Sequence, residues 1–171
     1  GHVDIIQFFH QLDQNDINPA MSNGKTVLHL AAKFGHLNIF KYYKDKVSDI
    51  NPRKISNDTN NGRSPLHYSA QNGHLDILEY ISNLIEEKNP SDTNGYTPLH
   101  LASLNGHLSC AQFIVDSLVD KVPKAGSYWN ERTPVHTAAQ NGQVVILEYF
   151  YQMNPSSFTQ ADTNGWTFLH Y

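Results

Sequence analysis

Ten histidines in 171 residues are the feature of this sequence that most readily suggests chemistry. Three pairs are seven residues apart, namely His29/His36, His67/His74 and His100/His107. Imidazole is a common zinc ligand, so this ladder of pairs could hold metal ions. Nine of the ten histidines, however, occupy two positions that recur along the chain, and a turn separates the members of each pair. We therefore interpret them as structural groups that pair buried polar atoms, and we predict neither a metal ion nor a cofactor.

The single cysteine, Cys110, stands where the other copies of a recurring pattern have isoleucine. Its equivalents are Ile5, Ile39, Ile77 and Ile146. We predict a buried core side chain, because apolar surroundings disfavour the thiolate that a nucleophile or redox sensor needs. One cysteine excludes an internal disulfide and favours a reducing compartment, so the expected location is the cytoplasm, with the nucleus as the alternative.

Other classes of function are disfavoured by composition and by missing motifs. Twelve basic and sixteen acidic residues give a net charge of −4, which argues against a nucleic-acid partner. No apolar run approaches the roughly 20 residues that membrane insertion requires. The chain has no nucleophile elbow, phosphate-binding loop, His-Glu-x-x-His or dinucleotide-binding glycine pattern. We predict that the protein is not an enzyme.

Two short motifs repeat in step along the whole chain. The first ends in a histidine, and these histidines are 38, 33, 36 and 34 residues apart, at His29, His67, His100, His136 and His170. The second begins with a glycine, and these glycines are 34, 38, 33 and 36 residues apart, at Gly1, Gly35, Gly73, Gly106 and Gly142. A fixed period of this length indicates a stack of similar structural units.

Each unit predicts two helices and a turn. A Ser or Thr followed by Pro, as at Ser64-Pro65, is typical of a helix N-terminus. Asn72-Gly73 suits the left-handed conformation that ends this first helix. Apolar residues at helical spacing over 75–85 then predict a second helix with one buried face. A later proline stops it, and Asn94-Gly95 predicts the tight turn of a hairpin-like finger.

This unit resembles the ankyrin repeat, whose pattern Gly-x-Thr-Pro-Leu-His-x-Ala-Ala-x-x-Gly-His-x-x-Ile is present in four nearly complete copies. The resemblance implies an all-α solenoid of stacked antiparallel helix pairs with projecting hairpin-like fingers. It also implies that the first histidine of each unit hydrogen-bonds to backbone and links adjacent units. We predict one array over 1–171: a half repeat over 1–20, repeats over 21–58, 59–91, 92–127 and 128–161, and a partial repeat over 162–171.

Two fingers depart from the pattern. The segment after Pro52 is lengthened, which accounts for the longest unit. Glu131 replaces a finger glycine and would be strained if the turn keeps a positive φ.

The resemblance further implies that partners dock on finger tips and the inner-helix face, at positions that vary between units. The residues after the finger glycine position are Lys25, Arg63, Tyr96, Arg132 and Trp166. The pairs before the inter-helix glycine are Lys33-Phe34, Gln71-Asn72, Leu104-Asn105 and Gln140-Asn141, and Trp129 joins the set. Four cations, several aromatic residues and no carboxylate predict a partner with acidic and apolar groups. In the alternative interpretation, the aromatic side chains pack against the next finger.

We therefore predict a non-catalytic scaffold that binds a partner protein or peptide through its concave face and finger tips. The alternative is a recognition or tethering segment of a larger protein, such as a channel, an enzyme-targeting module or a toxin. The chain begins inside one unit at Gly1 and ends inside another at Tyr171, so we expect the natural polypeptide to continue at both ends.

Overall fold

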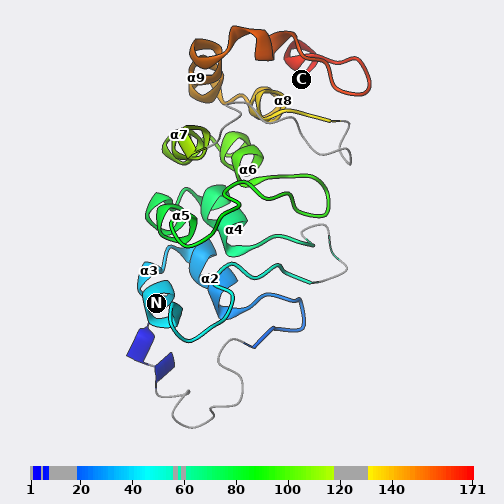
Figure 1. The fold of residues 1–171 in the computed structure, drawn as a ribbon. Helices are drawn as coiled ribbons and strands as arrows, with labels where there is room; N and C mark the ends of the chain where they lie inside the picture. The colour runs from blue at the N-terminus through cyan, green and yellow to red at the C-terminus, as the bar shows by residue number, and fades with distance from the viewer. Residues whose placement is uncertain (1, 5, 8–18, 56–57, 59–60, 118–130) are drawn as a thin grey trace.

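The structure, a computed structural model, describes residues 2–4, 6–7, 19–55, 58, 61–117 and 131–171. Helices are its only regular secondary structure over these ranges (Figure 1). The α-helices are α2 (Val27–Phe34), α3 (Leu37–Tyr43), α4 (Pro65–Asn72), α5 (Leu75–Ser82), α6 (Pro98–Leu104), α7 (Leu108–Ser117), α8 (Pro134–Gln140) and α9 (Val144–Met153). Two short 3₁₀ helices follow, η1 (Pro155–Thr159) and η2 (Phe168–His170). Across the described ranges, no helix has the length and apolar character needed to cross a bilayer.

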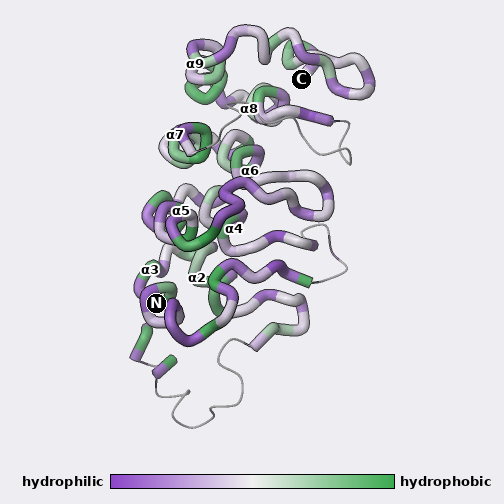
Figure 2. The backbone as a smooth tube through the Cα atoms, viewed as in Figure 1, coloured by the Kyte–Doolittle hydropathy of each residue, from purple (hydrophilic) through white to green (hydrophobic). Residues whose placement is uncertain are grey.

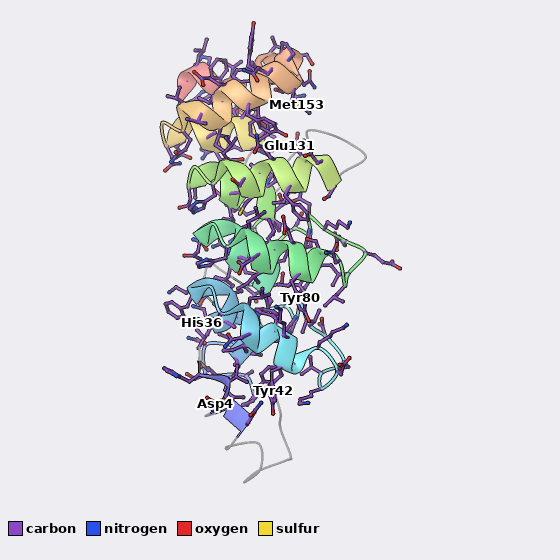
Figure 3. All side chains as sticks on the ribbon, turned by 90° about the vertical axis from the view of Figure 1, so that its left-hand side faces the viewer. Asp4, His36, Tyr42, Tyr80, Glu131 and Met153 are labelled. Carbon is purple, nitrogen blue, oxygen red and sulfur yellow. The ribbon has the colours of Figure 1, made fainter. Side chains whose placement is uncertain are left out.

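The helices form two columns of an elongated stack (Figure 1). The inner column contains α2, α4, α6 and α8, and each of these helices contacts the next. The outer column contains α3, α5, α7 and α9, whose neighbours also touch (Figure 3). Extended fingers project from the inner column on the side away from the outer helices (Figure 1). The predicted all-α solenoid of helix pairs and fingers is therefore confirmed.

Each inner helix begins at a cap that involves the recurring histidine. In α4, the backbone N–H of Ser64 donates to Nδ1 of His67 over 3.1 Å, and Pro65 takes the first helical position. The other three inner helices have the same capping box, with threonine as the cap residue. An imidazole thus takes the place that glutamate or glutamine usually has in this arrangement.

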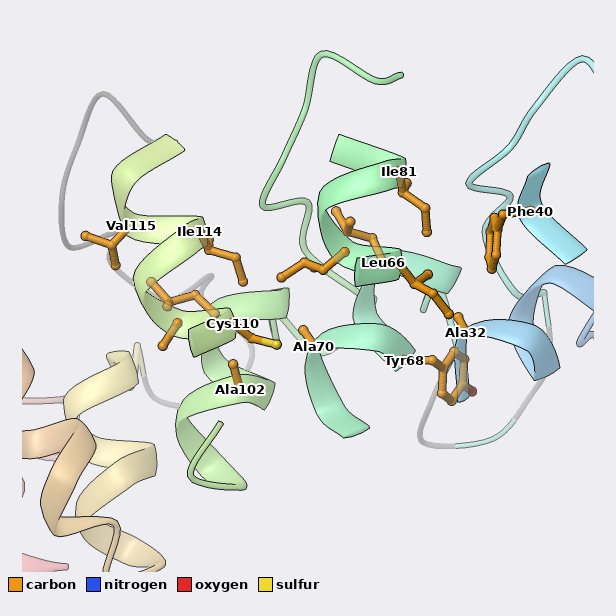
Figure 4. Packing of buried hydrophobic residues seen from close by; sticks show 14 of the residues in the cluster. Ala32, Phe40, Leu66, Tyr68, Ala70, Ile81, Ala102, Cys110, Ile114 and Val115 are labelled. Carbon is orange, nitrogen blue, oxygen red and sulfur yellow. The ribbon is translucent and has the colours of Figure 1, made fainter. Parts of the chain in front are cut away.

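The core lies between the two columns and continues from unit to unit. Leu66, Ile77, Ile81 and Leu99 are fully buried within it. Figure 4 shows Cys110 among these apolar side chains, and its exposed fraction is 1%. Figure 2 shows the same division along the chain, since apolar segments concentrate in the helices and polar ones in the fingers. Burial of this continuous core is the main force that holds successive units together.

The fingers keep one hydrogen-bond pattern although their lengths differ. In a short finger, Asp92 N–H donates to the carbonyl of Tyr96 over 2.8 Å, and Gly95 N–H donates to the carbonyl of Asp92 over 3.0 Å. In the lengthened finger, Lys54 N–H donates to the carbonyl of Arg63 and Gly62 N–H donates to that of Lys54, both over 2.8 Å. Lys54 therefore occupies the register position that Asp92 occupies in the next finger.

Glu131 has a φ of 52°, so its turn keeps the left-handed conformation despite the loss of glycine. The predicted backbone strain at this position is therefore present. The sequence also indicates a second lengthened connection, over 124–128, which lies outside the described residues.

The described glycines between paired helices have a positive φ, and three of the four, Gly35, Gly73 and Gly106, also lie close to the next unit. A Cβ on Gly73, whose φ is 75°, would lie 2.6 Å from Nδ1 of His107. A Cβ on Gly142, whose φ is 65°, would meet no described atom within 4 Å. Substitutions at these two positions therefore distinguish the energetic cost of backbone strain from the cost of crowding by a neighbouring unit.

We expect Gly73→Ala to lower the free energy of unfolding more than Gly142→Ala does. Both substitutions force alanine into the left-handed region, at a cost of about 1–2 kcal/mol. Gly73→Ala additionally displaces the His107 ring, for a further loss of about 1 kcal/mol or more. Urea denaturation followed by circular dichroism measures both values, and equal losses would contradict this account.

Candidate interaction surface

The first histidine of each unit joins two units through both of its ring nitrogens. Nδ1 of His67 accepts the N–H of its own cap residue, Ser64, while Nε2 lies 3.2 Å from the carbonyl oxygen of Tyr96 in the next finger. His29, His100 and His136 make the same link over 3.0–3.1 Å, to the carbonyl oxygens of Arg63, Arg132 and Trp166. The unit-linking role that the resemblance implied is confirmed.

These contacts determine the charge of the ring. A backbone N–H can only donate and a carbonyl can only accept, so Nδ1 carries no proton and Nε2 carries one. Burial lowers the pKa of His29 and His100 to about 4. Burial and, secondly, the charge of Arg63 lower the pKa of His67 to about 3. The histidines are therefore neutral hydrogen-bonding groups at neutral pH.

The second recurring histidine links each unit to the one before it. Nε2 of His74 lies 3.2 Å from the carbonyl of Lys33, and Nε2 of His107 lies 3.1 Å from that of Gln71. In the next unit, the Nε2 amide of Gln143 donates to the carbonyl of Leu104 over 3.2 Å. A carbonyl at the end of α2, α4 and α6 thus receives a donor from the following unit, as an exposed helix terminus requires.

Neither histidine nor cysteine is arranged for chemistry in the described part of the chain. No three His, Cys, Asp or Glu side chains gather there into a group that could hold a metal ion. The pKa of Cys110 is raised to about 11, mainly by burial and secondly by the charges of Asp76 and Glu79. The prediction of a core cysteine is confirmed, and the thiol is not activated.

Arg63 differs from the sequence-based interpretation. We expected a cation available to a partner, but the residue is 8% exposed and its Nε donates to Oδ2 of Asp92 over 2.9 Å. Its Nη1 also donates to Oε1 of Gln71 over 3.2 Å. The side chain therefore joins two fingers and an inner helix, and its charge is neutralised inside the protein.

Arg132 makes a similar contact within its unit and a different one with the next. Its Nη1 donates to Oε1 of Gln140 over 3.2 Å, and its guanidinium carbon lies 4.5 Å from the ring centre of Tyr171. The carboxylate equivalent to Asp92 is Asp162, which instead accepts the hydroxyl of Tyr171 over 2.7 Å. This arginine thus contacts an aromatic ring where Arg63 has a carboxylate.

The carboxylates of Asp92 and Asp162 are functional groups that the sequence analysis missed. Oδ1 of Asp92 accepts the N–H groups of Asn94 and Tyr96, and Oδ1 of Asp162 accepts those of Asn164 and Trp166. The signal was present, because the string Asp-Thr-Asn-Gly occurs twice. An aspartate in that position closes an Asx turn and leaves its second oxygen free to meet the preceding finger.

The three asparagines of the predicted set have a structural use. Each donates its side-chain amide to the carbonyl four residues earlier at the end of its own inner helix. These bonds join Asn72 to Tyr68, Asn105 to Leu101 and Asn141 to Thr137, over 2.8–3.1 Å. The asparagines therefore satisfy helix-terminal carbonyls before any partner binds.

The remaining predicted residues form what we call the inner surface, made of the finger positions and the exposed ends of the inner helices. Phe34 is 58% exposed and Trp166 is 46% exposed. Lys33 and Gln140 are exposed, whereas Lys25, Tyr96 and Leu104 are partly buried. Trp129 lies outside the described residues.

Aromatic side chains at the far end of this surface also contact one another. Trp166 stacks on His170 with ring centres 6.3 Å apart and meets Tyr171 edge-on at 5.6 Å. Tyr96 meets His100 edge-on at 6.0 Å. These ring contacts join residues of one unit, so they do not show the packing against the next finger that the alternative interpretation predicted.

A groove of about 550 Å³ lies elsewhere and contains none of the predicted residues. Its lining is Asp49, Asn51, Pro52, Arg53, Ile55, Ser64, Ile85, Glu87 and Pro90. Two of its three charged residues, Arg53 and Glu87, pair with each other over 3.8 Å. Nη1 of Arg53 also donates to the carbonyl of Ser91 over 2.6 Å, so this cation is already engaged.

Comparison with protein-family models gives two matches. A model described as ankyrin repeats (3 copies) matches residues 46–125, and one described as ankyrin repeats (many copies) matches residues 1–42. A comparison with curated proteins finds no significant match.

The histidine geometry predicts that acid destabilises the fold. The folded-state pKa values lie below the usual value of 6.5, so the unfolded chain takes up protons first as the pH falls. Stability is therefore complete above about pH 6.5 and declines toward pH 4. At pH 5 we expect a loss on the order of 1–2 kcal/mol for each of His29, His67 and His100, measured by urea denaturation at several pH values.

Replacing one histidine provides the control for this measurement. His100→Gln should reduce the slope of unfolding free energy against pH by about one proton's contribution between pH 6 and 5. Val135→Ala, a core substitution beside the next histidine of the series, should lower stability without altering that slope. Identical slopes for His100→Gln and the parent would rule out this histidine as a source of acid sensitivity.

Proposed function

Because the chain belongs to the ankyrin-repeat family, whose repeats generally mediate contacts between proteins, we propose that it binds a partner protein or peptide on its inner surface. Domains of this family are typically non-catalytic interaction modules. The partner in this proposal carries acidic and apolar groups.

The observation that carries the proposal is the exposure of large aromatic side chains beside cations on one surface. Phe34 is more than half exposed, and the ammonium of Lys33 lies 5.3 Å from the centre of its ring. A monomeric protein gains nothing in stability from exposing such a side chain, and aromatic residues dominate the affinity of protein interfaces. In this proposal, Phe34 is the apolar contact that anchors the partner.

The positions of neighbouring groups support the same surface. In two units a finger arginine donates to a glutamine at the C-terminal end of its own inner helix, in the bonds Arg63–Gln71 and Arg132–Gln140. Finger positions and inner-helix ends are therefore close in space. A partner that contacts Phe34 would also be within reach of Lys25, the finger cation of the same unit, whose charge would accelerate its association.

The test is affinity capture with a variant that alters only exposed side chains. Lys33→Glu combined with Phe34→Ala removes the aromatic anchor and reverses one charge, while the backbone carbonyl of Lys33 remains available to His74. We expect recovery of specifically bound proteins to fall by about tenfold or more. Quantitative mass spectrometry of the bound fraction measures this change.

The matched control carries the same types of change on the outer helices. Lys44 is exposed at the end of α3, and Tyr151 is 57% exposed on α9. Lys44→Glu with Tyr151→Ala should retain the partners that the parent binds. If the inner-surface variant retains them equally well, or if only the outer-helix variant loses them, the proposal is wrong.

A further inference from the structure

The junctions between consecutive fingers differ in charge. At the junction of Arg63 and Asp92, an arginine of one finger meets an aspartate at the base of the next, and both are almost completely buried. This ion pair is complete within the protein. It shows which groups the fold brings together at such a junction. One is the residue after the glycine turn of a finger, here Arg63. The other is the residue whose N–H opens the hydrogen-bond ladder of the following finger, here Asp92, and we call this the first ladder position.

At the preceding junction, the first ladder position carries a positive charge instead of a negative one. The finger residue is Lys25, and the ladder position of Asp92 is occupied by Lys54, as the backbone hydrogen bonds show. Lys54 is 1% exposed and forms an ion pair with Asp58, four residues later in the lengthened finger. The carboxylate that neutralises Arg63 therefore has no counterpart for Lys25.

Lys25 contacts an aromatic ring instead. Its Nζ lies 5.2 Å from the ring centre of Tyr68, and within the described ranges it forms no ion pair. Its pKa is lowered by burial first, and then by the charges of Lys33 and Lys54, while the charge of Asp58 acts in the opposite direction with the smallest effect. A nearby anion would relieve the repulsion between these lysines.

The hydroxyl of Tyr68 is a second group at this junction that lacks a partner. The residue is 4% exposed, and its Oη is buried without a hydrogen bond among the described atoms. Figure 4 shows the ring between its own helix α4 and the preceding inner helix α2. An unpaired buried hydroxyl is costly, because it has given up water without gaining another acceptor.

We propose that Lys25 and Tyr68 form a subsite for one carboxylate of an acidic side chain in the partner. The carboxylate serves Lys25 as its counterion, as Asp92 serves Arg63 at the next junction, and it accepts a hydrogen bond from the Tyr68 hydroxyl. The flexible lysine side chain can move from the ring to the carboxylate without a change in the backbone. This inference rests on the proposed function and specifies which group of the partner is recognised.

The charge balance favours a monoanion. Lys54 is paired with Asp58, and Arg63 is paired with Asp92, so among the described residues of this junction Lys25 is the cation without an ion pair of its own. A carboxylate neutralises that cation, whereas a dianionic phosphate would add a second negative charge beside two aspartates. Phe34, exposed at the end of α2, provides an apolar contact for a residue close to the acidic one.

The probe is a phage-displayed library of random dodecapeptides, selected on the folded protein. We expect the selected peptides to share an Asp or Glu near an apolar residue. For a selected peptide made synthetically, replacement of that carboxylate by its amide should weaken binding to the parent protein about tenfold, measured by fluorescence anisotropy. Phosphoserine at the same position should bind less tightly than the carboxylate.

Two variants assign this preference to the proposed groups. Tyr68→Phe removes only the unpaired hydroxyl, so we expect the fold to be retained and the preference for carboxylate over amide to fall by several-fold. Lys25→Glu should reverse the selection toward Lys or Arg at that peptide position. Lys46→Glu is the control, because Lys46 lies 4.8 Å from the ring centre of Tyr42 near the end of α3 and should leave the acidic preference unchanged.

The outcomes separate this inference from the broader proposal. Peptides that lose binding to Lys33→Glu/Phe34→Ala but show no acidic preference would overturn the subsite and leave the proposed function standing. Peptides unaffected by that variant would overturn both. Tighter binding of phosphoserine, or an acidic preference that survives both Tyr68→Phe and Lys25→Glu, would also overturn the subsite.

Discussion

The array depends on a neutral imidazole held at both ring nitrogens. In the best-buried case, Nδ1 of His67 accepts the N–H of Ser64 and Nε2 donates to the carbonyl of Tyr96 in the next unit. One side chain thus caps a helix and positions the following finger. Both partners are backbone groups, so the link does not depend on which side chains the neighbouring unit carries. This explains how units of unequal length stack with one geometry.

Much of this architecture is predictable from local residue types. A Ser or Thr before Pro, a histidine three residues after the cap and a glycine at the end of the inner helix each have a local physical reason, and the structure places them as expected. Cys110 was predictable because isoleucine occupies the equivalent position in other units. For Glu131 the sequence left a strained turn and a rebuilt finger as alternatives, and the structure shows that its turn keeps a positive φ.

The candidate surface was predicted less completely because its charges pair between units. Arg63 and Asp92 are 29 residues apart, and no periodicity within one unit shows that their side chains meet. The register of Lys54 was also hidden, since the lengthened finger places eight residues between this lysine and the residue that closes the ladder, Arg63. The position of a residue after the finger glycine therefore predicted where its side chain lies. It did not predict whether the charge of that side chain is available to a partner or already paired within the protein.

The separation of backbone and side-chain roles leaves room for specificity. The backbones of the fingers that contain Arg63 and Tyr96 are each held by a hydrogen-bond ladder and by a histidine from the preceding unit. The side chain at the first ladder position can therefore change from aspartate to lysine while the register is kept. At one junction this position completes an ion pair, and at another it leaves Lys25 and the hydroxyl of Tyr68 without a polar partner. A buried group left without a partner weakens the free protein, but it increases the gain when a complementary group arrives. The same repeated scaffold can therefore combine junctions that serve stability with a junction suited to recognition.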